Sequence, residues 1–254
     1  MAESGPLWHA VARRGGAPVC DAGKEAHGLS SSRGTPVTGW SAAEGLGAYR
    51  DGVTVICELA AQFSARTWGS ATPCAEWRAA DLAGHLRCVA DDYQEYLDEA
   101  PGSRLSRLMA TGAHPDTLAR KLARQNAAEL AALPDRPPAE HIAAFAGAAR
   151  AYADRLGPVW ALPHHRYRGV LVTVGGMAGA ACVEWHLHAW DLARALGMDY
   201  RPAGPEIVLA GWRAGLPQLP LGDGAGSDPW LALLRASGRS PGWPGRPGAA
   251  AMMS

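Results

Sequence analysis

The sequence has few lysines and cysteines, and it has no excess of charge of either sign. Its 254 residues include 24 Lys+Arg and 24 Asp+Glu, so the formal net charge is zero. Proteins that bind nucleic acid or an anionic membrane surface need a basic excess. We therefore expect neither nucleic acid nor a membrane as a partner.

The cysteines are too few and too irregularly spaced for a disulfide framework or a cysteine-rich zinc site. They number five, an odd count, and no Cys-x-x-Cys pair occurs among them. This pattern is typical of reduced thiols in a cytosolic protein, and we expect a cytoplasmic location. The five are Cys20, Cys57, Cys74, Cys88 and Cys182.

Long hydrophobic runs are also missing. The longest uncharged stretch, residues 169–183, is too short and too rich in glycine to span a bilayer. Residues 1–38 have no continuous apolar core of the kind a signal peptide needs, and we expect a flexible or disordered N-terminal tail there. Since 48% of the chain is hydrophobic and only 19% is charged, the remainder is able to bury a core.

Apolar residues recur at helical spacing, and no segment keeps the alternation of a strand. The sequence therefore predicts an all-α fold, a four-helix bundle over residues 39–200 followed by a short C-terminal extension over 201–254. A loop is expected over 102–115. An irregular, solvated connection is expected over 159–167, with His164, His165, Arg166 and Arg168 in or beside it. The alternative is that these four residues line the mouth of the pocket and meet an anionic substrate. The helices are predicted near 41–68, 79–97, 117–133, 139–156 and 177–196, with short helical patches near 207–214 and 229–236.

Two of these helices place polar residues on apolar faces. Glu184 and His188 are four residues apart and share one face of the last long helix, whereas His186 points elsewhere. On the second helix, His85 falls on the apolar side. A carboxylate and imidazoles on buried faces need a partner, because an unpaired buried charge is costly.

These three residues predict a site of two imidazoles and one carboxylate in the bundle core. Such a set suits zinc, iron(II), nickel or manganese, and it leaves a coordination position open for water or substrate. The plainer alternative is an ordinary Glu–His ion pair beside a hydrogen-bonded core histidine, and spacing alone does not exclude it.

Two motifs resemble those of a known family. Thr72-Pro73-Cys74-x-x-Trp77 with Asp81-Leu82-x-x-His85-Leu86 resembles the opening motif of mycothiol-dependent maleylpyruvate isomerase-like proteins, a branch of the DinB-like four-helix-bundle superfamily. The segment Glu184-x-x-x-His188-x-Trp190-Asp191-Leu192-Ala193-x-Ala195-x-Gly197 resembles the second motif. Gly238-Arg239-x-Pro241 is similar to the ending of one subgroup.

The resemblance implies that His85, Glu184 and His188 bind a divalent metal, usually zinc, and that mycothiol is the thiol cosubstrate. The isomerase carries a further C-terminal domain, which the roughly 55 residues after Gly197 do not match in length. The resemblance therefore bears more directly on the fold and the metal site of this chain than on its reaction.

An aspartate, two cysteines and two tryptophans near the proposed ligands give weaker indications. Asp191 is a candidate for orienting His188 or for proton transfer, with a helix-end salt bridge as the alternative. Cys88 and Cys182 are interpreted as buried inert thiols, and Trp185 and Trp190 as core or interface residues.

The resulting hypothesis is a metal-dependent enzyme that activates a low-molecular-weight thiol for isomerisation or S-transfer on a small electrophilic substrate. The thiol and this substrate are the expected partners, and the chain is expected to be a monomer or a homodimer. Two alternatives stay open: a non-catalytic metal-binding bundle, and a metal-dependent hydrolase that would need no thiol.

Overall fold

The computed structural model describes residues 40–74, 77–99, 102–217, 219, 221, 228–239 and 242, with residues 115–116 described by their backbone alone. The tail predicted over residues 1–38 lies outside the described residues, as do Cys20 and Pro241.

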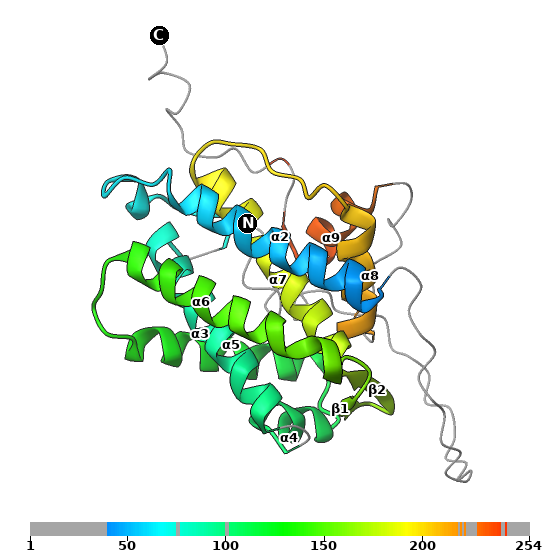
Figure 1. Cartoon of the computed structure of the whole chain (residues 1–254). Helices are drawn as coiled ribbons and strands as arrows, with labels where there is room; N and C mark the ends of the chain where they lie inside the picture. Colours follow the sequence, from blue (N-terminus) through cyan, green and yellow to red (C-terminus); the bar gives the residue numbers. More distant parts are fainter. Residues whose placement is uncertain are drawn as a thin grey trace, which may run out of the picture.

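Four long helices pack together as the predicted bundle, with a fifth, α5, against α3 (Figure 1). Each carries an apolar face at helical spacing, which is what a bundle core needs. The all-α prediction is therefore confirmed apart from one small hairpin. The five helices are α2 (Ala42–Ala60), α3 (Ala79–Asp98), α5 (Pro115–Ala132), α6 (Pro138–Leu156) and α7 (Val174–Ala195).

Helix α7 is the centre of the bundle. Every one of its residues except Arg194 is buried, as expected for a helix covered on all sides. Trp185 is fully buried and packs edge-on against Phe145, with a ring-centroid distance of 4.9 Å. Trp190 is buried as well, which confirms the interpretation of both tryptophans as core residues.

Helix α2 begins as predicted but ends early. A capping box joins Ser41 and Glu44 at its start. The prediction that it continues to residue 68 is wrong, because Ser64 and Thr67 bond each other's backbone and so compete with helical hydrogen bonds. A short 3-10 turn, η1 (Thr67–Gly69), follows instead.

The loop predicted over 102–115 contains a short helix, α4 (Arg104–Ala110), and that prediction is wrong. Ser103 begins the helix, since its hydroxyl accepts a hydrogen bond from the backbone N–H of Ser106. Flanking glycines at positions 102 and 112 concealed this short element in the sequence.

The connection predicted to be irregular and solvated is mostly a β-hairpin. Strands β1 (Pro163–Tyr167) and β2 (Val170–Thr173) pair antiparallel after a single-turn 3-10 helix, η2 (Gly157–Val159). Arg168 and Gly169 both have positive φ, 47° and 88°, as a two-residue type I′ turn requires. The strands are too short to show alternation, which is why the sequence did not indicate them.

The interpretation of His164 and His165 as solvated is also wrong. Both are buried, because the hairpin packs against α4 and α7 and the irregular register between Pro163 and His165 lets two successive side chains face inward. Arg166 and Arg168 are exposed, as predicted.

The C-terminal extension packs on the bundle. Helices α8 (Pro205–Gly215) and α9 (Pro229–Ala236) lie along one side, with α8 against α7 and α2 (Figure 1). The backbones of α7 and α8 nearly touch: a Cβ atom on Gly179 would lie 2.5 Å from the carbonyl oxygen of Gly211. Glycine is needed there because no side chain fits between the helices.

No helix in the described part of the chain combines the length and the apolar character needed to cross a membrane.

Candidate metal centre

The structure brings the three predicted ligands together. His85 comes from α3, and Glu184 and His188 come from α7. One ligand atom from each lies within 4.8 Å of the others, and all three side chains are buried. Two stretches of chain that are far apart in the sequence thus meet here, as predicted.

Their inward-facing atoms have few partners among the described residues. Both ring nitrogens of His85 are buried without a hydrogen-bond partner, and Oε2 of Glu184 and Nε2 of His188 are buried with only each other in reach, 3.2 Å apart. Buried polar groups without partners are costly, and they are rare in native proteins. One ligand atom from each of the three residues lies close to the other two, so a group bound between them would satisfy all three together.

The protonation of His188 identifies what kind of group this must be. Its Nδ1 lies 2.9 Å from Oδ2 of Asp191 and donates a hydrogen bond to it, so in the neutral imidazole Nε2 carries a lone pair. That lone pair lies 3.2 Å from Oε2 of Glu184. Two acceptors at this distance repel each other unless a proton or a cation is shared between them.

A metal ion satisfies this site better than a proton does, because His85 also faces it. Burial and the charges of His188 and Arg239 hold the pKa of His85 well below its usual value, so this imidazole is neutral. The rings of His85 and His188 are nearly perpendicular, with centroids 5.1 Å apart. One proton cannot bridge three ligand atoms, whereas a divalent cation accepts lone pairs from all of them.

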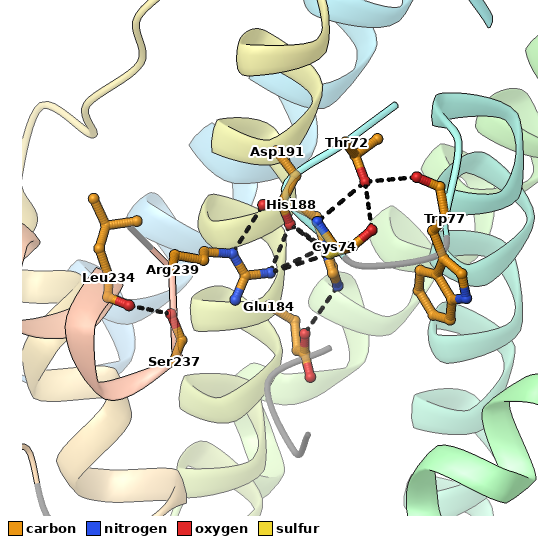
Figure 2. A network of polar contacts seen from close by, with 9 residues as sticks. All are labelled: Thr72, Cys74, Trp77, Glu184, His188, Asp191, Leu234, Ser237 and Arg239. Carbon is orange, nitrogen blue, oxygen red and sulfur yellow. Dashed lines mark hydrogen bonds and ion pairs between the residues drawn. The ribbon is translucent and has the colours of Figure 1, made fainter. Parts of the chain in front are cut away.

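The opposite face of His188 holds an ion pair between a carboxylate and a guanidinium. Asp191 accepts hydrogen bonds from Nε and Nη2 of Arg239, at 2.9 Å and 2.6 Å (Figure 2). Both side chains are completely buried. Burial alone would raise the pKa of Asp191, but Arg239 and His188 outweigh it and keep the carboxyl ionised well below its usual pKa.

This pairing favours a positioning role for Asp191 over proton transfer. A carboxylate held ionised by a guanidinium accepts a proton poorly, but it fixes the tautomer and orientation of the imidazole beside it. The assignment of Asp191 as a catalytic residue stays a prediction.

Cys74 completes this second cluster. Its thiol donates to Oδ2 of Asp191 at 3.1 Å and lies 3.7 Å from Nη2 of Arg239 (Figure 2). The pKa of the thiol is raised by burial and by Asp191. Thr72 holds the loop in place, since its hydroxyl accepts from the backbone N–H of Cys74 and donates to the carbonyl oxygen of Trp77.

Cys74, His188 and Asp191 are also close enough together to hold a metal ion. They differ from the first group in one respect: their cation is already present, as the guanidinium of Arg239. His85, Glu184 and His188 are therefore the better candidates for a metal site, whereas the other face of His188 holds an ion pair.

The sequence argument gave no role to Cys74 or Arg239, although both lie in quoted motifs. Arg239 reaches the site because α9 ends in a Schellman turn. Gly238 has a φ of 75°, and the N–H of Arg239 bonds the carbonyl oxygen of Leu234 at 2.7 Å. The glycine that directs this turn was the available signal.

Other polar residues of α7 and α3 stay outside the site. His186 points away, as predicted, and bonds the hydroxyl of Tyr200 and the carbonyl oxygen of Ala48. Cys182 is fully buried and Cys88 partly so, and burial raises the pKa of both thiols, that of Cys88 to about 11. These values agree with the interpretation of both as inert thiols.

One family model matches the chain, and it is described as the mycothiol maleylpyruvate isomerase N-terminal domain. The match covers residues 49–193, more than half of the 254 residues. The chain belongs to this family. The matched segment contains all three proposed ligands and ends before α8, so Arg239 lies outside it. No curated protein and no solved structure shows a significant match.

Proposed function

We propose that this protein is a metal-dependent enzyme that activates a low-molecular-weight thiol, mycothiol, for isomerisation or S-transfer on a small electrophilic substrate. The observation that carries the proposal is the set of buried ligand atoms on His85, Glu184 and His188. Membership of the mycothiol maleylpyruvate isomerase family supports the choice of thiol.

The three ligands would hold a divalent cation, and zinc suits two imidazoles and a carboxylate. When bound, such a cation lowers the pKa of a coordinating thiol, so that the thiolate nucleophile is present at neutral pH. A catalytic site also needs an open coordination position, and three protein ligands leave one.

The protein's own residues prepare this site. Asp191 holds His188 in the tautomer whose Nε2 lone pair faces the metal position. Arg239 keeps Asp191 ionised, and the thiol of Cys74 donates to the same carboxylate oxygen as His188 does. His85 needs no second bond to stay neutral, because burial disfavours its charged form.

The first test is the metal content of the purified full-length protein and of its variants. We expect one zinc ion per chain in the wild type, and little or none in H85A and E184Q. H186Q is the matched control, because His186 is buried on the same helix but faces away from the site. Equal metal in all four proteins would show that the ligand assignment is wrong.

The second test measures turnover. We expect the zinc-loaded protein to convert members of a panel of activated alkenes and alkyl halides only when mycothiol is added. Turnover without thiol would support the hydrolase, and full metal occupancy without any turnover would support a non-catalytic metal-binding bundle. A cytoplasmic location belongs to the same proposal, since the described cysteines are all free thiols.

A further inference from the structure

A cavity beside Glu184 is not accounted for by the metal site. It lies between α3, α4, α5, the hairpin, α7 and the C-terminal end of α8, and Glu184 forms part of its wall. Its volume is about 70 Å³, several times the roughly 10–15 Å³ that a single water needs. A molecule in this cavity would therefore lie next to the metal position.

The wall of this cavity is mostly apolar. Aliphatic and aromatic side chains from all of these segments line it, and the segments are far apart in sequence. A cavity of this composition binds ligands through apolar contact, with a few polar groups to fix orientation. Its apolar lining includes Tyr93, Leu105, Met109, Leu122, Val172 and Met177.

The lining described by the structure contains no lysine or arginine. Asp92 lies in the wall and forms an ion pair with Arg104, which is outside it. The Arg104 guanidinium lies 2.8 Å from Asp92 and 2.9 Å from Glu129. Its positive charge is therefore already balanced by these two carboxyl groups and does not stabilise a third anion.

His165 is the remaining lining group that could carry a positive charge, and its hydrogen bonds keep it neutral. Nε2 of His164 lies 3.2 Å from the carbonyl oxygen of Tyr96 and must donate to it. Nδ1 of His164 is then an acceptor, so Nδ1 of His165, 2.9 Å away, carries the proton between them. Burial and His164 lower the pKa of His165 to about 4, so a second proton does not bind at neutral pH.

An anionic ligand in this cavity would leave water and meet carboxyl groups instead of cations. Asp92 and Glu184 are the acidic groups among the described lining residues, and burial together with Glu129 raises the pKa of Asp92 to about 7. The metal would offset Glu184, but it is also the position proposed for the thiol sulfur. A second carboxylate on a substrate would thus have no counter-ion, and burying an unpaired charge is strongly unfavourable.

We propose that this cavity binds the uncharged, largely apolar part of the electrophilic substrate, and that it discriminates against dicarboxylates. The inference rests on the proposed function, because it assigns the substrate class of the same site. It sets this chain apart from an isomerase of maleylpyruvate, a dicarboxylate, although the chain belongs to that family.

Binding can be tested without catalysis, by NMR of the zinc-loaded full-length protein with ¹³C-labelled methionine methyl groups. Met109 and Met177 line the cavity, whereas Met198 is exposed elsewhere and serves as an internal control. The two probes are methyl benzoate and benzoate, which differ in charge. We expect the ester to shift the signals of Met109 and Met177 but not of Met198, and to bind at least about tenfold more tightly than benzoate.

Equal or tighter binding of benzoate would overturn the proposed substrate class. No shift of Met109 or Met177 by either probe would overturn the cavity as a binding site. Because the signals do not depend on turnover, a protein that binds the ester but shows no thiol-dependent activity would refute the proposed function and leave the cavity assignment intact.

A charge-adding variant gives an independent check. Val89 is half-buried and lines the cavity, whereas Val170 is exposed on the hairpin and does not. In V89R the preference should move at least about tenfold toward benzoate, because a cation is now present, and V170R should behave as wild type. An unchanged preference in a folded V89R would contradict the proposal, and a cooperative thermal transition followed by circular dichroism shows whether the variant is folded.

Discussion

The two ring nitrogens of His188 face two clusters of buried polar groups that differ in one respect. On the Nε2 side, His85 presents ring nitrogens with no hydrogen-bond partner among the described residues, and Glu184 contacts only His188. On the Nδ1 side, Asp191 is bonded by His188, by Cys74 and by the Nε–Nη2 edge of a buried guanidinium. Proximity of ligand-type residues is therefore not enough to locate a metal: the cluster that contains Arg239 already has its cation, and the other cluster is the candidate for a metal ion.

Removing the guanidinium should produce the largest effect. We expect R239M to lose about 3–5 kcal/mol in the free energy of unfolding, because it leaves the carboxylate of Asp191 buried without its counter-ion. Urea denaturation measures this loss. The matched control is R201M, which breaks a solvent-exposed pair with Asp228 and should cost less than about 1 kcal/mol. Similar losses in the two variants would show that the Nδ1 cluster is not the buried, cation-dependent pair described above.

The second-largest effect is expected from D191N, because Asp191 bonds His188 and His188 belongs to both clusters. In D191N the orienting acceptor for Nδ1 is weakened, so we expect zinc affinity to fall about 10–100-fold, as is usual when an outer partner of a ligating histidine is lost. Competition with a zinc-binding dye measures this change. Undiminished affinity in a folded D191N would mean that the two clusters act independently.

Lowering the pH should affect the two clusters differently. Burial opposes a proton on His188, but its bonds to Asp191 and Cys74 and the charge of Glu184 raise its pKa, so protons compete with the metal even near neutral pH. Zinc affinity should fall about tenfold per pH unit from pH 7 to 5 for each proton that must leave.

Over the same range, metal-free wild type should stay more stable than metal-free R239M at every pH. The pKa of Asp191 is lowered on folding, so its contribution is present above the unfolded pKa of about 3.9 and is lost only as pH falls through the lower folded value. Denaturant titrations at pH 7, 6 and 5 check this expectation. A difference that disappears by pH 5 would contradict the assignment of a permanently ionised pair.

The smallest effect is expected from Cys74. In C74A zinc content should equal that of wild type, and affinity should change less than about tenfold, since the thiol bonds Asp191 and is not one of the assigned ligands. Loss of zinc from C74A would instead assign the metal to the Nδ1 side.

Much of this molecule was predictable from local pattern. Helical spacing and the Ser41–Glu44 capping box indicated the bundle helices, because an amphipathic face repeats every three to four residues. The same spacing placed Glu184 and His188 on one face. Pattern was insufficient for α4 and for the hairpin, whose few residues carry too little periodicity to distinguish a short element from a loop.

The sequence by itself determined which side chains of α3 and α7 turn inward, and that these include two imidazoles and a carboxylate. Only the tertiary structure decided which of their atoms are left unpaired, since that depends on contacts between segments far apart in the chain. Arg239 shows why: it lies 48 residues from Asp191, and it reaches the core only because α9 packs beside the bundle and ends at Gly238. The cavity wall is likewise built from segments that no local pattern relates, and the absence of a free cation among its described residues is a property of their packing.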